Sequence, residues 1–186
     1  MTKKINKIFI ATGGTGGHIF PAYSLAKHFI DKKIRVKIIT DKRGFKYLKK
    51  YNDLNIIQIT SSTLINKNIF KFLISSLIIL YSITRSFILL LFDRPNFVIG
   101  TGGYSSFPVC IAAKFLKIPF IIYENNLHIG KANKYLLPLT KKMFVSNSEL
   151  EGIPQKYKYK ICEIGNIIRK EIINFQKDYN KNFIDG

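Results

Sequence analysis

The chain has 186 residues, enough to bury one core, and 47% of them are hydrophobic and 22% charged, which is ordinary for a globular domain. Thirty Lys and Arg oppose eleven Asp and Glu, so the net charge is +19, a balance that favours phosphates, nucleic acids or anionic lipids. The basic residues are scattered and no nucleic-acid-binding motif occurs, so we expect no nucleic acid partner. Part of the charge reflects a composition rich in lysine, asparagine and isoleucine.

Apolar runs alternate along the first half of the chain with segments of helical periodicity. Each run is short and continuous, as expected of strands that are covered on both faces. The expected elements are, in order, a strand at 8–11, a helix at 18–30, a strand at 35–40, a weaker helix at 46–51, a strand at 56–59 and a long apolar helix at 68–92.

The second half continues the same alternation. The expected elements are a strand at 97–99, a helix at 107–116, a strand at 118–124, a polar loop entering a short helix at 125–137, strands within 141–147 and 159–166, and a helix at 167–174. This order predicts an α/β fold with a Rossmann-like, doubly wound parallel sheet. Ligands of such sheets bind at the carboxyl ends of the strands, so the loops that follow strands are the candidate functional segments.

The long apolar segment, FLISSLIILYSITRSFILLL at 72–91, has the length of a membrane span but carries Arg85 well inside it. Hydroxyl-bearing side chains dilute it further: Ser75, Ser76, Tyr81, Ser82, Thr84 and Ser86. We favour a helix that packs one face on the sheet and exposes another apolar face with some membrane contact. A purely buried core helix and a true membrane span are the alternatives.

The two cysteines, Cys110 and Cys162, lie far apart in apolar sequence and do not have the spacing of metal ligands. We interpret them as reduced core thiols of a cytosolic protein. The apolar run near the N-terminus is too short for a signal peptide and is followed by glycines, so it reads as a first strand.

Two glycine clusters each follow an expected strand and precede an expected helix: GGTGGH at 13–18 and GTGGYSSFP at 100–108. Bare backbone lets a ligand approach closely, and the N-terminus of the next helix attracts an anion. The spacing fits neither the dinucleotide fingerprint nor a P-loop. Two such loops at one edge of a parallel sheet predict a diphosphate site; tight turns without a ligand are the alternative.

Two side chains near these loops are candidates for catalysis. His18 begins the helix after the first cluster, and an imidazole can act as a general base near neutral pH; the alternative is a polar residue that bonds locally. Glu124 ends a strand and can bind sugar hydroxyls or orient a base; the alternative is a carboxylate that caps a loop. The acids are spread out, so we expect neither a metal nor another cofactor.

Four segments carry a resemblance to a known family: GGTGGHIFPAYSLA, GTGGYSSFP, YENNLHIGKANKYL and GNIIRKEI, in this order between residues 13 and 172. They resemble the MurG enzymes of glycosyltransferase family 28. The resemblance implies a GT-B fold, in which residues 1–174 form the N-terminal acceptor-binding domain and residues 175–186 begin the interdomain linker. The donor-binding C-terminal domain would then be a separate domain or chain.

The resemblance also implies an activity. Family members transfer N-acetylglucosamine from UDP-N-acetylglucosamine to undecaprenyl-diphospho-muramoyl-pentapeptide (lipid I) at the cytoplasmic face of the cell membrane, with inversion and without a metal. This half is expected to be peripheral to the membrane and inactive alone. The alternatives are a non-catalytic, membrane-recruiting subunit of a split glycosyltransferase and a diacylglycerol glycosyltransferase of the same family.

Residue roles follow from the same resemblance. His18 is the expected base, and Glu124 belongs with it to the catalytic set. Asn126 and Arg169 match positions that reach the nucleotide sugar. The full set of expected substrate-binding residues is Gly14, Thr15, Gly16, Gly17, Gly102, Gly103, Tyr104, Asn126, Asn133 and Arg169. The sequence departs from the family at three positions, which hold Tyr123 for His, Asn125 for Gln and Ile167 for Pro.

Overall fold

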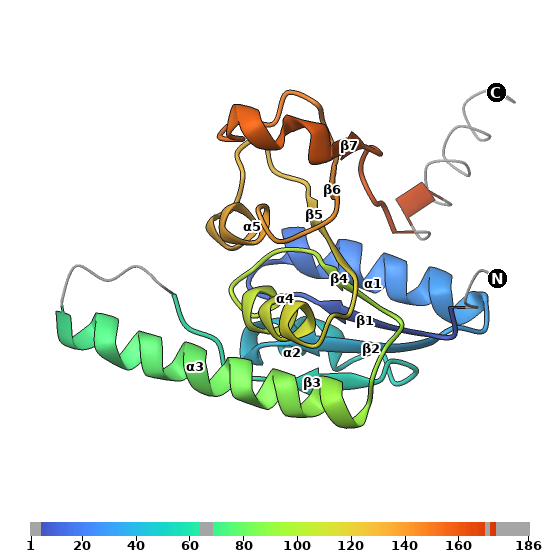
Figure 1. Ribbon diagram of the computed structural model, residues 1–186. Coiled ribbons are helices and arrows are strands. Elements are labelled where there is room, and N and C mark those ends of the chain that lie inside the picture. The colour runs from blue at the N-terminus through green and yellow to red at the C-terminus, as the bar shows by residue number, and fades with distance from the viewer. Residues whose placement is uncertain (1–4, 64–68, 170–171, 174–186) are drawn as a thin grey trace, which may run out of the picture.

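The computed structural model describes residues 5–63, 69–169 and 172–173. At its centre is a parallel, seven-stranded sheet in the order β3-β2-β1-β4-β5-β6-β7 (Figure 1). The strands are β1 (Lys7–Ala11), β2 (Arg35–Thr40), β3 (Ile56–Gln58), β4 (Phe97–Gly100), β5 (Phe120–Glu124), β6 (Met143–Val145) and β7 (Ile161–Glu163). Each expected strand is present, and the predicted doubly wound α/β class is confirmed.

Helices connect the strands. They are α1 (Gly16–Asp31), α2 (Lys42–Leu48), α3 (Ile69–Phe92), α4 (Ser106–Phe115), α5 (Lys131–Leu136) and the 3-10 helix η1 (Gln155–Lys160). The predicted position of α2 was wrong: the helix begins four residues earlier because the Asp41 carboxylate caps it, accepting a hydrogen bond from the Gly44 amide at 2.8 Å. No pattern in the sequence predicts η1.

The sheet divides two apolar clusters. Phe9 and Ala11 of β1 lie in a cluster with residues of α3, α4 and α5, whereas Ile8 and Ile10 lie in a cluster with residues of α1 and α2. All four side chains are at most 3% exposed. Successive side chains of a strand point to opposite faces, so a strand with helices on both sides needs apolar residues at every position.

Helix α3 confirms the predicted long apolar helix; it packs against α4, and its C-terminal part joins through Leu90 the apolar cluster that includes Phe9 and Val98 of the sheet. Its inner face consists of Ser75, Ile79, Ser82, Ser86 and Leu90. Its outward face is apolar and includes Ile69, Phe70, Leu73, Leu77, Leu80, Tyr81, Ile88 and Leu91, all about half exposed or more. The helix is long and apolar enough to cross a membrane, and only 22% of its most apolar window is buried. A purely buried core helix is therefore not what the structure contains.

The last described segment differs from the prediction. Residues 167–169 have no helical structure, and residues 172–173 are helical; the rest of the helix expected at 167–174 and the linker expected at 175–186 lie outside the described residues. The Tyr123 hydroxyl holds this segment by donating to the Gly165 carbonyl and accepting from the Ile167 amide, each at 3.2 Å.

The two cysteines differ in environment. Cys110 is buried, as predicted for a core thiol, and burial raises the pKa of its thiol far above the ordinary value. Cys162 is exposed, so the prediction of a core thiol is wrong there: the strand β7 that carries it lies at the edge of the sheet. Both thiols are unbridged.

Candidate functional site

The two glycine loops meet where the order of the strands reverses direction. The first loop follows β1 and the second follows β4, and these strands are neighbours in the sheet. Gly103 has a φ of +79°, and a Cβ added there would lie 2.1 Å from the Gly13 carbonyl oxygen. Glycine is needed at 103 both for this backbone angle and for this contact. The predicted side-by-side placement of the loops is confirmed.

Hydroxyl groups fasten the loops together. The Ser105 Oγ donates to the Thr12 carbonyl at 2.7 Å. The Thr12 and Thr101 hydroxyls, one from each loop, both donate to the His18 carbonyl at 3.0 Å. The backbone of His18 is therefore fixed by both loops, which fixes the start of its side chain as well.

The His18 ring packs against the second loop. A Cβ at Gly102 would lie 2.6 Å from His18 Nδ1, so only glycine leaves room for the ring, and Gly102 has a φ of +95°. His18 Nδ1 is buried and has no hydrogen-bond partner among the described residues. The ring borders a cavity of about 180 Å³ lined by His18, Gly102, Gly103, Tyr104, Glu124, Gly130, Lys131, Ala132 and Asn133.

Helix α1 begins at the same cavity edge. Its N-cap residue Thr15 makes no side-chain capping bond, and no acidic residue lies in its first turn. The first amides of a helix have no partner within the helix, and the dipole makes this end attractive to an anion. The Gly17 carbonyl accepts a hydrogen bond from the Asn125 Nδ2 at 2.8 Å, which ties the loop after β5 to this helix.

Glu124 is completely buried and organises the loop that follows it. Its Oε1 accepts from the Asn126 amide (3.2 Å) and the Asn126 Nδ2 (2.6 Å). Its Oε2 accepts from the Gly130 amide (2.8 Å) and the Asn133 Nδ2 (3.0 Å). Four internal donors thus surround the carboxylate, which is the arrangement of a loop-capping residue at the wall of the cavity.

Asn133 faces the same cavity. Its Nδ2 also donates to the Tyr123 carbonyl at 3.0 Å, and its Oδ1 is buried without a partner among the described residues. His18 and Asn133 both line the cavity, and each side chain also has one buried polar atom without a partner among the described residues. Buried polar atoms are nearly always paired, so two unpaired atoms on side chains that line one cavity favour a site for a polar ligand.

Arg169 lies apart from this cavity. Its guanidinium stacks over the Phe20 ring of α1 at 4.3 Å from the ring centroid. Phe20 in turn packs against the position where a Cβ at Gly16 would stand, at 3.0 Å. The structure thus places Arg169 beside the start of α1, on the segment that Tyr123 holds, and not among the residues around His18.

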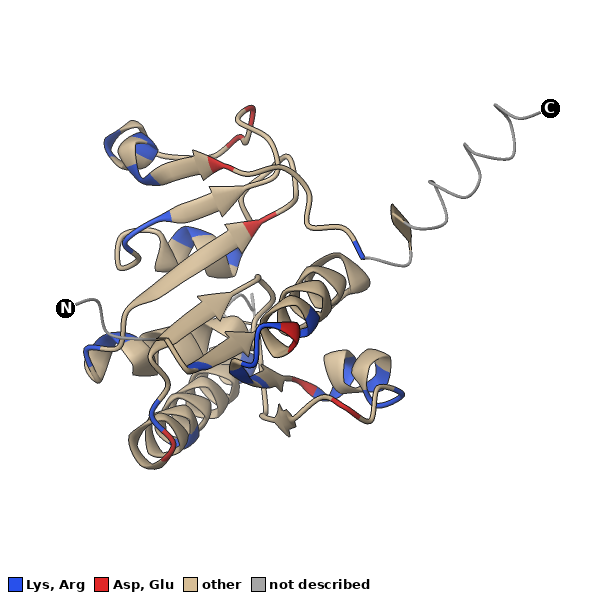
Figure 2. Ribbon diagram, turned by 90° about the vertical axis from the view of Figure 1, so that its right-hand side faces the viewer, with Lys and Arg blue, Asp and Glu red and all other residues tan. Residues whose placement is uncertain are grey.

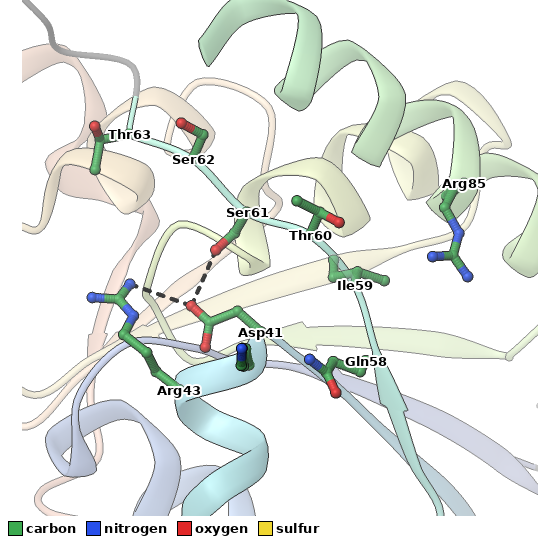
Figure 3. A pocket seen from close by; sticks show the side chains of 10 residues that line it. Asp41, Arg43, Gln58, Ile59, Thr60, Ser61, Ser62, Thr63 and Arg85 are labelled. Carbon is green, nitrogen blue, oxygen red and sulfur yellow. Dashed lines mark hydrogen bonds and ion pairs between the residues drawn. The ribbon is translucent and has the colours of Figure 1, made fainter. Parts of the chain in front are cut away.

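A second, polar pocket of about 660 Å³ was missed by the sequence analysis. We call it the β2–β3 pocket; it lies beyond the ends of β2 and β3 (Figure 3) and is lined by Asp41, Lys42, Arg43, Gln58, Ile59, Thr60, Ser61, Ser62, Thr63 and Arg85. No recognisable motif links these residues in the sequence, since they come from the start of α2, the end of β3 with the loop after it, and α3. The one signal was Arg85, a charge inside an apolar helix.

Asp41 is the anchor of the β2–β3 pocket. It accepts hydrogen bonds from the Ser61 hydroxyl (3.1 Å) and from Arg43 (3.3 Å) in addition to its helix cap. Burial raises the pKa of the Asp41 carboxyl, but the bonds from Gly44 and Ser61, with the charge of Arg43, outweigh burial and hold the pKa below the ordinary 3.8. Asp41 therefore stays ionised and holds Arg43 in place.

No group of three or more His, Cys, Asp or Glu side chains in the described part of the chain is arranged to hold a metal ion. The basic residues are spread over the surface of the fold rather than gathered into one patch (Figure 2).

Comparison with known proteins identifies the family. Residues 8–145 match the model of the glycosyltransferase family 28 N-terminal domain. A Pelagibacter ubique protein named UDP-N-acetylglucosamine–N-acetylmuramyl-(pentapeptide) pyrophosphoryl-undecaprenol N-acetylglucosamine transferase is 34% identical over 177 residues, 94% of this chain and 48% of that protein. A Rickettsia felis protein of the same name is 37% identical over 91% of this chain and 46% of that protein.

The fold agrees with a solved structure. The crystal structure of Acinetobacter baumannii MurG matches with a TM-score of 0.68 and 24% identity, over 85% of this chain and 45% of that one. The chain spans about half the length of the curated relatives it matches. The chain belongs to glycosyltransferase family 28, and its fold is that of the N-terminal domain of a GT-B glycosyltransferase.

Proposed function

We propose that this chain is the acceptor-binding half of an inverting, metal-independent transferase. The transferase moves N-acetylglucosamine from UDP-N-acetylglucosamine to undecaprenyl-diphospho-muramoyl-pentapeptide. The relatives' names support the substrates. One observation carries the proposal: His18 lines a cavity between two glycine loops and the Glu124 loop.

In the proposed reaction an acceptor hydroxyl attacks the anomeric carbon of the donor sugar from the face opposite UDP. The new glycosidic bond forms as the bond from that carbon to the UDP oxygen breaks, and UDP leaves with the electron pair. His18 takes the hydroxyl proton, as a general base near neutral pH can. Glu124 acts through the loop it organises and fixes Asn126 and Asn133 beside the acceptor.

The remaining site residues bind substrate in this proposal. The first glycine loop and the start of α1, including Gly14, Thr15, Gly16 and Gly17, supply backbone amides for a diphosphate. Gly102, Gly103 and Tyr104 form the acceptor wall next to His18. Arg169, stacked on Phe20 beside the first loop, reaches toward the nucleotide sugar that a C-terminal domain or separate chain presents.

We further propose that the chain works as a peripheral protein at the cytoplasmic membrane surface. The outward face of α3 exposes bulky apolar side chains while Ser75, Ser82 and Ser86 face the protein, the reverse of the usual pattern for a helix in water. The excess of basic residues favours an anionic leaflet. The same face favours a second candidate function, a non-catalytic subunit that recruits a partner chain to the membrane.

The experiment combines this chain with the separately produced C-terminal half of the Pelagibacter ubique relative. Transfer from UDP-N-acetylglucosamine to a lipid I analogue by the pair, but by neither half alone, supports the proposal. His18→Ala should then lower turnover by roughly 10²-fold or more. His28→Ala is the matched control, because His28 is exposed on the same helix. A folded pair without transfer contradicts the split-enzyme function. Full activity of the pair that carries His18→Ala excludes His18 as the base and favours the second candidate, the non-catalytic recruiting subunit.

A further inference from the structure

Arg43 stands between the β2–β3 pocket and the first glycine loop. Its Nη2 lies 3.3 Å from the Asp41 carboxylate and 4.0 Å from the place where a Cβ at Gly14 would be. The Asp41 side chain is 5% exposed and the Arg43 side chain 62% exposed. The buried carboxylate therefore fixes one side of the guanidinium, and the other side stays accessible to solvent. An anchored guanidinium is pre-oriented for a second, outer anion.

Arg85 enters the same pocket from α3. Figure 3 shows its side chain leaving the helix on the side of Gln58 and Ile59. It makes no ion pair or hydrogen bond within the described part of the chain. On the helix it lies between the inner face, with Ser82 and Ser86, and the exposed apolar face, so it marks the margin of that apolar surface.

The charges of the pocket suit an anion. Three cationic side chains (Lys42, Arg43 and Arg85) face one carboxylate, Asp41, which leaves a net charge of +2. The hydroxyls of Thr60 and Thr63 add donors along one wall, where the Ser61 and Ser62 hydroxyls donate to Asp41 and Ser75 (Figure 3). Guanidinium groups match the geometry of phosphate oxygens, and a doubly charged diphosphate matches the excess charge.

The pocket is a neighbour of the His18 cavity. A narrow apolar gap of about 10 Å³ lies between them: it shares Ser62 with the β2–β3 pocket, and Tyr104, Lys131 and Ala132 with the cavity beside His18. An extended ligand that lies over the outside of this gap would touch His18, Arg43 and Arg85. Such a ligand would place its sugar at His18, a charged neck at the arginines and an apolar chain on the outward face of α3.

We propose that Arg43 and Arg85 hold the diphosphate of the lipid-linked acceptor between the first glycine loop and α3. This inference rests on the proposed function, because it is that function's acceptor that joins a sugar, a diphosphate and a prenyl chain in this order. The two arginines are binding residues in this assignment, and Asp41 is the residue that positions Arg43.

The test uses farnesyl diphosphate, a short prenyl diphosphate, added to the full chain in the presence of EDTA, with calorimetry as the readout. Arg43→Gln and Arg85→Gln should each weaken binding about tenfold, the loss expected for one charge-assisted hydrogen bond. Lys46→Gln, an exposed lysine of α2 outside the pocket, should bind like the unsubstituted chain. Arg43→Lys keeps the charge but not the paired N–H donors of the guanidinium, so its affinity should lie between those of the unsubstituted chain and Arg43→Gln. Thermal unfolding verifies that each variant is folded.

Three further probes separate the possible sources of the phosphate. Binding of inorganic pyrophosphate or UDP as tight as that of farnesyl diphosphate would indicate a site that recognises the diphosphate alone. Binding of phosphatidylglycerol vesicles would indicate a general affinity for anionic surfaces. The inference is overturned if the unsubstituted chain and the glutamine variants bind farnesyl diphosphate equally. It is also overturned if the glutamine variants lose vesicle binding by the same factor as they lose farnesyl diphosphate binding. In either case the transfer assay still tests the proposed function. Absence of binding by the unsubstituted chain also overturns the inference, whereas transfer by the combined halves then still supports the proposed function.

Discussion

The Ser105 hydroxyl donates to the Thr12 carbonyl at 2.7 Å and so joins two turns that lie 93 residues apart in the sequence. Ser105 is completely buried, and a Cβ at Gly13 would stand 1.8 Å from its Oγ. The hydroxyl therefore occupies the space that the missing side chain of Gly13 leaves. The two glycine loops fit each other as one unit, whatever they bind.

Ser105→Ala should lower the free energy of unfolding by about 1–3 kcal/mol, because it leaves the buried Thr12 carbonyl without its partner. Urea unfolding measures the loss. The control is Ser148→Ala, at an exposed serine, which should change stability by less than about 0.5 kcal/mol. Equal stability of the two variants would show that this bond does not hold the loops together.

Gly103→Ala should destabilise the chain far more than Gly165→Ala. Both glycines have φ near +79°, so both substitutions carry the backbone strain of about 1–2 kcal/mol. A Cβ at Gly165 meets nothing within 4 Å, whereas one at Gly103 meets the Gly13 backbone. The loss at Gly103 should therefore exceed about 4 kcal/mol, as for severe overpacking. Thermal unfolding of the two variants separates the cost of backbone strain, which both carry, from the cost of the clash, which only Gly103→Ala carries. Similar losses of stability in the two variants would refute the clash with Gly13.

Glu124→Gln should loosen the loop after β5 without unfolding the sheet. An amide offers one acceptor oxygen where the carboxylate offers two, and its NH₂ would face donors such as the Gly130 amide or the Asn133 Nδ2. Hydrogen exchange at the Asn126 and Gly130 amides should speed up about tenfold or more. Glu149→Gln, at an exposed glutamate, serves as the control and should leave both amides unchanged.

Acid should weaken the fold partly through Asp41. Its pKa is lower in the folded chain than the ordinary 3.8, so the unfolded chain takes up the proton first. The stability that Asp41 contributes is therefore complete above about pH 4 and is lost as the pH falls through the folded-state pKa. The pKa values of Asp53 and Asp93 are also lowered, so these groups contribute to the acid sensitivity of both proteins. The contribution of Asp41 is therefore read from the difference in the free energy of unfolding between the unsubstituted chain and Asp41→Asn. Unfolding followed from about pH 6 to about pH 2 should show this difference shrinking in acid; a constant difference would contradict it.

Membrane binding should depend on the outward face of α3. The double variant Leu77→Asp and Leu80→Asp places two charges on side chains that are 67% and 61% exposed, so the fold should persist while vesicle binding falls. Liposome flotation measures the fraction bound. The control carries the same two charges at Gln155→Asp and Tyr159→Asp, exposed positions on η1. Equal flotation of both variants would exclude α3 as the contact surface.

The fold could be predicted because its signals are local. Continuous apolar runs such as IFIA at 8–11 mark buried parallel strands, and each glycine cluster follows a strand. The start of α2 could not be placed by periodicity, because it depends on a bond between the Asp41 side chain and the Gly44 amide. The environment of Cys162 depends on β7 lying at the sheet edge, which the sequence around it does not reveal.

The candidate site was predictable to the extent that parallel strands bring their ends to one edge. This rule placed His18 beside Gly102 and brought Glu124 to the same cavity. It did not reveal that four internal donors surround the Glu124 carboxylate, since three of them come from the irregular loop after β5 and the fourth from Asn133 of α5. Nor did it place Arg43 and Arg85 at one pocket, whose opposite ends they line because α3 packs alongside the loop after β3 (Figure 3).

The two ends of α3 are attached to the protein very differently. Near its C-terminal end Leu90 is completely buried, and Phe87 and Leu89 pack against the core, whereas near its start the buried residues are Ser75 and Ile79. The start of the helix projects past the sheet (Figure 1). The start of α3 is thus held by fewer core contacts than its C-terminal end, and it is the part of the helix that stands farthest from the sheet and its loops (Figure 1).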